Sequence, residues 1–231
     1  MKIPVTTGSS YTVAVSLLAV LQAVSHVGLD LTDSPAAIIG ANGRIGRICA
    51  EILSLNLNRL FLVSRDKEQL DILAMQLRKM LYKHGKQCEI IATTNDRDAI
   101  RNAKIIMVVT TTQGSVCEVD DFNSGSVVCD ISQPRNISYQ MSQLRKDVLI
   151  FDGGIVKPPG DVKSHFFFGL PDGLVYACMA ETMILSLEEL YCNYSIGGNI
   201  SVMKVCKMMA LAEKHGFSVA SLKNFEEKKF L

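Results

Sequence analysis

The chain has 231 residues, 48% of them hydrophobic, and a formal net charge of +1 at neutral pH. This length and apolar content suffice to bury a sizeable core. The balanced charge, without a basic block, excludes nucleic acid as an expected partner. Seven cysteines without paired spacing favour a reducing compartment over a disulfide framework, and no clustered Cys/His pattern predicts a metal site.

The first predicted element is a helix over residues 9–27, where apolar residues recur at helical spacing. A charged start followed by an apolar stretch also resembles a secretory signal. Ser16 and Gln22 interrupt that stretch, which is too short and too polar to span a bilayer. We therefore expect a helix packed on the core of a cytoplasmic, soluble protein with no membrane span.

A short apolar run at residues 36–39 leads into three glycines and then a helical pattern. Gly40 permits a tight turn, Gly43 leaves room for phosphate oxygens, and Gly46 lets the helix pack close to the strand. The helix N-terminus then faces the diphosphate of a dinucleotide. The alternative is a strand-to-helix turn without a ligand. The loop residues expected to bind the cofactor are Gly40, Asn42, Gly43, Arg44, Ile45 and Gly46.

The next predicted strand, residues 59–63, ends at Ser64 and Arg65. NAD-binding folds usually place an acid at this strand end, where it accepts hydrogen bonds from ribose hydroxyls. A hydroxyl beside a guanidinium instead suits a 2′-phosphate, because arginine offers a planar fork of donors and a permanent charge. We therefore expect NADP(H), bound by Ser64 and Arg65. Two alternatives stay open: Asp66 can reach a ribose, and Arg65 with Lys67 can simply form a solvated helix start.

Strands and helices continue to alternate, and the strands are apolar without strict polar alternation, which is typical of a parallel sheet covered on both faces. The expected elements cover residues 67–84, 89–93, 96–101, 104–109, 126–130 and 148–151. The predicted fold is α/β: a doubly wound, Rossmann-like parallel sheet with its core at about 34–165. The whole chain, 1–231, is expected to form one NADP-binding domain.

Thr110 and Thr111 follow the strand expected at 104–109. Loops at the carboxyl ends of parallel strands line the ligand crevice, so both threonines are candidates for contacts with the ribose or the nicotinamide side of the cofactor. A plain polar loop is the alternative.

The C-terminal region, about 172–216, is expected to pack beside the sheet as a pair of helices. Helical patterns cover 172–194 and 201–215. Ser201 is the expected N-cap of the second helix, and Gly216 the residue that ends it.

Four segments carry a resemblance to a known family: TTGSSYTVA at 6–14, DGGIV at 152–156, YACMAETMILSLE at 176–188 and KHGF at 214–217. In order and spacing they are similar to segments of the cyanobacterial long-chain fatty acyl-(acyl carrier protein) reductases, which make fatty aldehydes with NADPH. The 176–188 block, similar to FACFAEAMLLEFE, is far more specific than a nucleotide-binding loop. A more general resemblance exists to shikimate-dehydrogenase-like domains, whose catalytic lysine and aspartate lie in a substrate domain with no equivalent found in this sequence.

The resemblance to the acyl reductases implies that Cys178 takes the acyl group as a thioester before hydride transfer. An acyl carrier protein or CoA thioester would then be the partner, and the product an aldehyde. A thiolate is a good nucleophile, and a place in the first turns of the helix expected from 172 would lower the pKa of the thiol if the thiol faces the amide ends of that helix. Without the resemblance, Cys178 would be interpreted as a buried helix cysteine.

Three other ionisable residues near these motifs have open roles. Glu181 is expected on the same helix face as Cys178, where it either positions a proton or a water or is an ordinary helix-face acid. His165 and His215 are candidate general acids, but surface or helix-end positions are favoured, since a cation suits the C-terminus of a helix.

Departures from the acyl reductases concern the substrate. Those proteins carry a large N-terminal region that helps to hold the acyl chain, whereas this sequence begins almost at the TTG segment. The acyl group can therefore be shorter, come from a different carrier, or be presented by a second subunit or a second copy. Two alternatives remain: an NADP-dependent dehydrogenase of a small alcohol or keto substrate without covalent catalysis, and a non-catalytic NADP-binding subunit.

Overall fold

The computed structural model describes residues 3–110, 118–162, 169–197 and 200–224. Six parallel strands form one sheet in the order β3-β2-β1-β4-β5-β6, which is the strand order of doubly wound dinucleotide-binding domains. The strands are β1 (Ala36–Ile39), β2 (Arg59–Val63), β3 (Glu89–Thr93), β4 (Ile105–Val108), β5 (Val127–Asp130) and β6 (Leu149–Asp152). The predicted fold class is confirmed.

Each face of this sheet contributes to a separate apolar core. In β1, Ala36 and Ile38 belong to one core, and Ala37 and Ile39 to the other. Because both faces are covered, the strand has no polar face, which explains its unbroken apolar sequence. The helices that cover the two faces are α2 (Arg44–Ser54) and α3 (Lys67–Lys83) on one side, and α4 (Asp96–Arg101) and α5 (Tyr139–Leu144) on the other.

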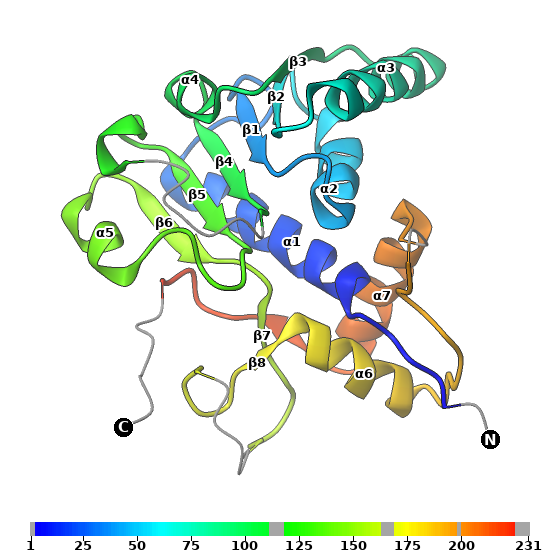
Figure 1. Ribbon diagram of the computed structural model, residues 1–231. Helices are drawn as coiled ribbons and strands as arrows, with labels where there is room; N and C mark the ends of the chain where they lie inside the picture. Colours follow the sequence, from blue (N-terminus) through cyan, green and yellow to red (C-terminus); the bar gives the residue numbers. More distant parts are fainter. Residues whose placement is uncertain (1–2, 111–117, 163–168, 198–199, 225–231) are drawn as a thin grey trace.

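Helix α1 (Ser9–Val27) lies between the sheet and the C-terminal helices (Figure 1). It packs against α2, α6, α7 and β5, and Val13, Val20 and Ala23 are fully buried. The expectation that this stretch is too short and too polar to span a bilayer is wrong, since by length and composition alone the helix could cross a membrane. However, 61% of its most apolar 18-residue window is buried inside the protein. The expectation of a core helix is confirmed.

The C-terminal region differs from the prediction. A helix was expected from residue 172, but the chain first forms β8 (Val175–Tyr176), and α6 covers only Ala177–Leu187. Gly173, at φ +79°, turns the chain just before β8, and Glu189, at φ +53°, follows the end of the helix. Both residues occupy the left-handed region, which a continuous α-helix does not contain.

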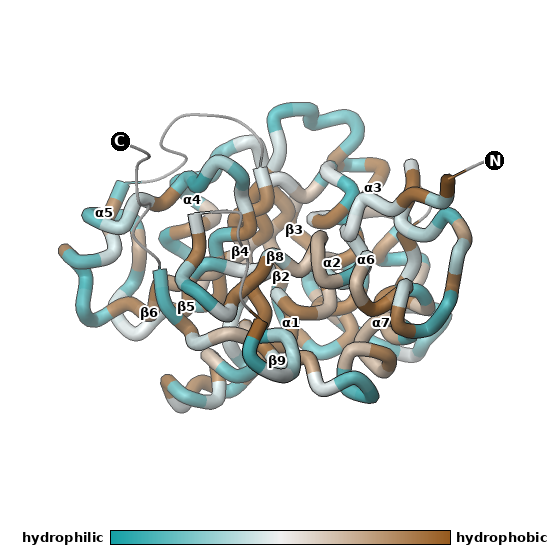
Figure 2. The backbone as a smooth tube through the Cα atoms, turned by 90° about the horizontal axis from the view of Figure 1, so that it is seen from below, coloured by the Kyte–Doolittle hydropathy of each residue, from teal (hydrophilic) through white to brown (hydrophobic). Residues whose placement is uncertain are grey.

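A second, antiparallel sheet explains why residues 175 and 176 are extended. Its order is β8-β7-β9, where β7 is Ile155–Lys157 and β9 is Ser218–Val219. Helix α7 (Val202–Lys214) precedes β9. Its predicted ends are confirmed: the Ser201 hydroxyl accepts a hydrogen bond from the amide of Lys204, and Gly216 takes φ +76°. In Figure 2, apolar segments gather toward the middle of the molecule and hydrophilic ones lie mainly along its outer turns.

Candidate active site: a dinucleotide cleft beside Cys178

A cleft of about 370 Å³ opens at the carboxyl ends of β1, β2 and β4. Most of the residues predicted to bind a dinucleotide line it, namely Gly40, Gly43, Arg44, Ile45, Ser64, Arg65 and Thr110. Asn42 and Gly46 do not line the cleft, and Thr111 lies outside the described residues. The sequence pattern therefore predicted the location of the cleft and most of its wall.

Backbone packing explains the glycines of this loop. Gly40 takes φ +94°, and a Cβ there would lie 2.9 Å from the carbonyl carbon of Val109. A Cβ on Gly46 would lie only 2.4 Å from the carbonyl oxygen of Gly40, so α2 approaches the loop more closely than any side chain permits. Gly46 thus shapes the cleft from behind its wall.

The start of α2 provides an anion-binding end. Gly43 is its N-cap and has no side-chain capping bond, so the first-turn amides of α2 face the cleft without a capping side chain. The Gly40 and Ala41 amides both donate to the Val63 carbonyl oxygen at 2.9 Å, which ties the loop to β2. A fixed loop and an uncapped helix start suit a phosphate group.

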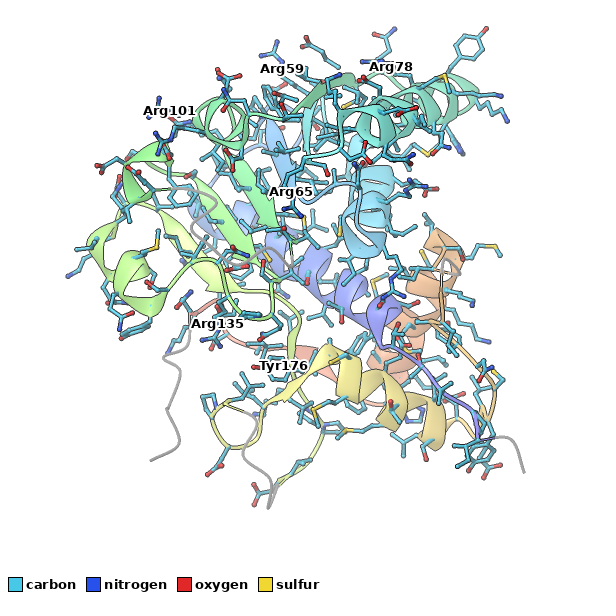
Figure 3. The ribbon with its side chains drawn as sticks, in the orientation of Figure 1. Arg59, Arg65, Arg78, Arg101, Arg135 and Tyr176 are labelled. Carbon is cyan, nitrogen blue, oxygen red and sulfur yellow. The ribbon has the colours of Figure 1, made fainter. Side chains whose placement is uncertain are left out.

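Arg65 and Asp66, which follow the end of β2, have different surroundings. Arg65 is exposed and lines the cleft, between β4 and α2 in Figure 3, whereas Arg59, Arg78 and Arg101 lie along the outer edge of the molecule. The Asp66 side chain accepts a hydrogen bond from the amide of Gln69 at 3.0 Å and caps α3. The acid is therefore engaged with its own helix, and the guanidinium is left facing the cleft.

The sequence did not identify three further polar residues of the cleft wall: Ser9, Thr94 and Asp96. Thr94 follows the carboxyl end of β3, so the rule that selected Thr110 would have found it. Asp96 begins α4, directly after that strand end. Ser9 has no such signal, because only the packing of α1 against the sheet brings it to the cleft.

A buried polar cluster supports the neighbouring strand ends. The Asp130 carboxylate, at the end of β5, accepts hydrogen bonds from the amides of Ser132, Asn136 and Ile137 at 2.8–2.9 Å. Burial raises the pKa of this carboxyl, and the amide bonds oppose that shift. The Asn136 side chain in turn donates to the Thr110 carbonyl oxygen at 3.3 Å, so the cluster braces the loop beside the cleft.

Cys178 is the second residue of α6 and is exposed. Its backbone lies directly against Gly8: a Cβ on Gly8 would be 2.1 Å from the Cys178 Cα and 2.4 Å from its Cβ. Gly8 is the N-cap of α1, and the next residue, Ser9, lines the cleft. The expected nucleophile therefore stands beside the first turn of α1, one residue along the chain from the cleft wall, although Cys178 itself does not line the cleft.

The expected lowering of the Cys178 pKa is wrong. Partial desolvation by the surrounding protein raises the pKa of this thiol, the backbone amides of Cys178 and Met179 act in the opposite direction, and the charge of Glu181 adds to the rise. The amides at the helix start therefore act on the thiol in the expected direction, but partial desolvation outweighs them.

Glu181 is fully buried and bonds to the segment before α1 and to the first turn of that helix. Its carboxylate accepts hydrogen bonds from the Thr6 hydroxyl and from the amide of Tyr11, the latter at 2.8 Å. His215 caps the end of α7, as favoured, and its Nε2 lies 2.5 Å from Glu188 Oε1. His165 lies outside the described residues. Among the described residues, no group of His, Cys, Asp or Glu is arranged to hold a metal ion.

Residues 22–152, more than half of the chain, match the family model described as shikimate / quinate 5-dehydrogenase. The chain belongs to the shikimate/quinate 5-dehydrogenase family and has a Rossmann-like fold. The matched region holds the dinucleotide cleft except Ser9, and it ends before Cys178.

Two named proteins are similar to nearly the whole chain. Aminotransferase PigE from a Serratia species is 30% identical over 233 residues, which cover 98% of this chain and 26% of PigE. The long-chain acyl-[acyl-carrier-protein] reductase of Synechococcus elongatus is 28% identical over 224 residues, which cover 94% of this chain and 62% of the reductase. The chain thus spans about a quarter and about three fifths of these relatives.

Among solved structures, quinate dehydrogenase from Corynebacterium glutamicum in complex with NAD is 14% identical, with a TM-score of 0.48. The match covers 90% of this chain and 62% of that one. It is a likeness of fold.

Proposed function

We propose that this protein is an NADPH-dependent reductase that converts a thioester-activated acyl group into an aldehyde through a thioester on Cys178. One observation carries the proposal: an exposed thiol at the start of α6 packs against Gly8, whose neighbour Ser9 lines the dinucleotide cleft. Similarity to an acyl-[acyl-carrier-protein] reductase over 94% of the chain supports it.

The fit of a pyridine dinucleotide rests on the loop between β1 and α2. The tight packing at Gly46, where an added Cβ would lie 2.4 Å from the Gly40 carbonyl oxygen, and the uncapped start of α2 form a cradle suited to a diphosphate. Thr110 lies at the end of β4, where the nicotinamide side would bind. A reduced nicotinamide supplies a hydride.

We favour NADPH over NADH because Arg65 faces the cleft while Asp66 is engaged in capping α3. A guanidinium attracts a 2′-phosphate and offers it a fork of donors. Asp96, on the same cleft wall, suits a sugar or base better than a phosphate. Replacing Arg65 with serine should weaken NADPH binding at least tenfold and leave NADH binding within about threefold. Calorimetric titration of both nucleotides measures this, and equal losses for the two would contradict the assignment.

The proposed reaction has two steps. The Cys178 thiolate attacks the carbonyl carbon of an acyl carrier protein or CoA thioester, and the carrier leaves as a thiolate that takes up a proton. A hydride then adds to the carbonyl carbon of the enzyme-bound acyl group. The C–S bond breaks, and the aldehyde and the Cys178 thiolate are released. Each acyl group therefore consumes one NADPH and one proton.

Intact mass spectrometry tests the first step. Wild-type protein incubated with an acyl-CoA or acyl carrier protein panel, without nucleotide, should gain the mass of one acyl group, and NADPH should remove it as aldehyde forms. Cys178→Ala should gain none, whereas Cys206→Ala, which removes another exposed thiol on α7, should behave as wild type. An equal adduct on wild type and Cys178→Ala would remove Cys178 from the mechanism.

Membership of the shikimate/quinate 5-dehydrogenase family favours a second candidate, a dehydrogenase of a small hydroxy or keto substrate without a covalent step. The family match ends at residue 152, so it gives no information about the role of Cys178. Under this alternative, nucleotide-dependent turnover of a hydroxy-acid panel would survive Cys178→Ala, whereas the reductase would lose its activity.

A further inference from the structure

A network of hydrogen bonds joins α6 to residues 6–11, which include the first turn of α1. One oxygen of the buried Glu181 carboxylate accepts from the Thr6 hydroxyl, and the other accepts from the amide of Tyr11 at 2.8 Å. The Thr6 hydroxyl oxygen itself accepts from the amides of Gly8 at 3.3 Å and Ser195 at 3.1 Å. The carboxylate therefore holds the chain on both sides of Gly8.

Gly8, which lies within this hydrogen-bonded segment, packs directly against the backbone of Cys178. The residue takes φ +72°, and its hypothetical Cβ would lie 2.1 Å from the Cys178 Cα and 2.5 Å from the Cys178 carbonyl oxygen. No side chain fits between the two backbones, so a displacement of the 6–11 turn changes the contact at Cys178. The same turn carries Ser9 into the cleft wall.

Glu181 and Cys178 lie on the same helix, α6. Glu181 lies three residues after Cys178, so the carboxylate and the thiol move as parts of one rigid element. Its two hydrogen-bond partners, Thr6 and Tyr11, lie on either side of Ser9, which lines the cleft. The helix that carries Cys178 is therefore bonded, through Glu181, to the segment that brings Ser9 into the cleft wall.

We infer that Glu181 is a positioning residue for hydride transfer: it holds the Cys178-bound acyl group in register with the dinucleotide cleft and takes no part in proton transfer. This inference rests on the proposed function of Cys178. The carboxylate is fully buried, and both of its oxygens accept bonds from the protein, so its place in the fold is that of an anchor. Hydride transfer is sensitive to such placement, because small misplacements of reacting atoms cost large factors in rate.

The test separates the two chemical steps. Acylation is followed by intact mass without nucleotide, and reduction by rapid mixing of the isolated acyl-enzyme with saturating NADPH in a single turnover. Glu181→Gln, Thr6→Val and the double variant are compared with wild type. Glu188→Gln is the matched control, because Glu188 is the C-cap of the same helix and its carboxylate bonds to Lys214 and His215 rather than to the segment that carries Thr6 and Tyr11.

The expected result is selective. Glu181→Gln and Thr6→Val should acylate within about threefold of the wild-type rate but reduce the acyl group about 10- to 100-fold more slowly. Because both variants break one network, the double variant should be no slower than Glu181→Gln within about threefold. The pH profile of reduction should keep its shape, and hydrogen exchange at the Tyr11 amide should accelerate. Glu188→Gln should match wild type in both steps.

Several outcomes would overturn the inference. Reduction at the wild-type rate by folded Glu181→Gln would do so, and so would additive losses in the double variant. Loss of one ionisation from the pH profile would assign Glu181 to proton transfer instead. If Glu181→Gln does not fold, Thr6→Val alone carries the test, because it keeps the Glu181 carboxylate and its bond from the Tyr11 amide while removing the bonds made by the Thr6 hydroxyl. Failure of wild type to acylate would refute the proposed function itself and is therefore distinguishable.

Discussion

Replacing Gly46 with alanine tests the close approach of α2 to the glycine loop. The added Cβ would start 2.4 Å from the Gly40 carbonyl oxygen, and real Cβ contacts essentially never fall below 3.0 Å. The helix start must therefore move by about 0.6 Å or more against backbone atoms that cannot rotate away. Overpacking of this kind costs about 3 kcal/mol, offset by about 1 kcal/mol because alanine is the better helix former.

The net loss of about 2 kcal/mol predicts a melting temperature about 4–8 °C lower for a chain of this length. Because the first turn of α2 faces the cleft, NADPH affinity should fall at least tenfold as well. Thermal unfolding followed by circular dichroism and calorimetric titration with NADPH measure the two effects on the same preparation.

Gly43→Ala is the matched comparison. Gly43 has an ordinary φ of −67°, and its added Cβ would lie 3.1 Å from the same oxygen, a much milder contact. It lines the cleft, so alanine should weaken NADPH binding at least tenfold while lowering the melting temperature by less than about 3 °C. If Gly46→Ala kept both its melting temperature and its NADPH affinity, the argument from close backbone approach would be refuted.

Three further predictions concern ionisable side chains. Since burial raises the pKa of Cys178, its alkylation by iodoacetamide should accelerate mainly above the pH typical of cysteine, and acceleration at a lower pH would contradict this. Asp121 is buried between Arg97 and Arg101, at 3.1 and 3.0 Å, so Asp121→Ala should lower the free energy of unfolding by about 2–3 kcal/mol in urea titrations. Lys214 and His215 lower the pKa of Glu188, so its stabilising effect is present above the unfolded-state pKa of about 4.3 and disappears as pH falls through the lower folded-state value. Glu188→Gln should therefore show a weaker loss of stability in acid.

The element pattern was predictable because local chemistry decides it. Unbroken apolar strands such as residues 36–39 arise only where both sheet faces are covered, and the helix from Ser201 to Gly216 carries its own N-cap and terminal glycine. The prediction of a helix from residue 172 was wrong, because a contact distant in sequence decides the conformation there. Val175 pairs with Val156 of β7, and a strand partner in the second sheet leaves no trace in the local pattern.

For the site, the amino-acid sequence by itself determined the glycine loop between β1 and α2, since two of its glycines are required by the local backbone: Gly40 by its positive φ and Gly46 by the close approach of the Gly40 carbonyl oxygen. It also singled out Cys178, through a resemblance. Only the tertiary structure decided that the turn before α1 meets the start of α6, so that Gly8 touches Cys178 and Glu181 reaches Thr6 and Tyr11. These contacts join residues about 170 positions apart, and the physical reason is packing: the buried faces of α1 and α6 determine them, and no local propensity encodes where two helices meet.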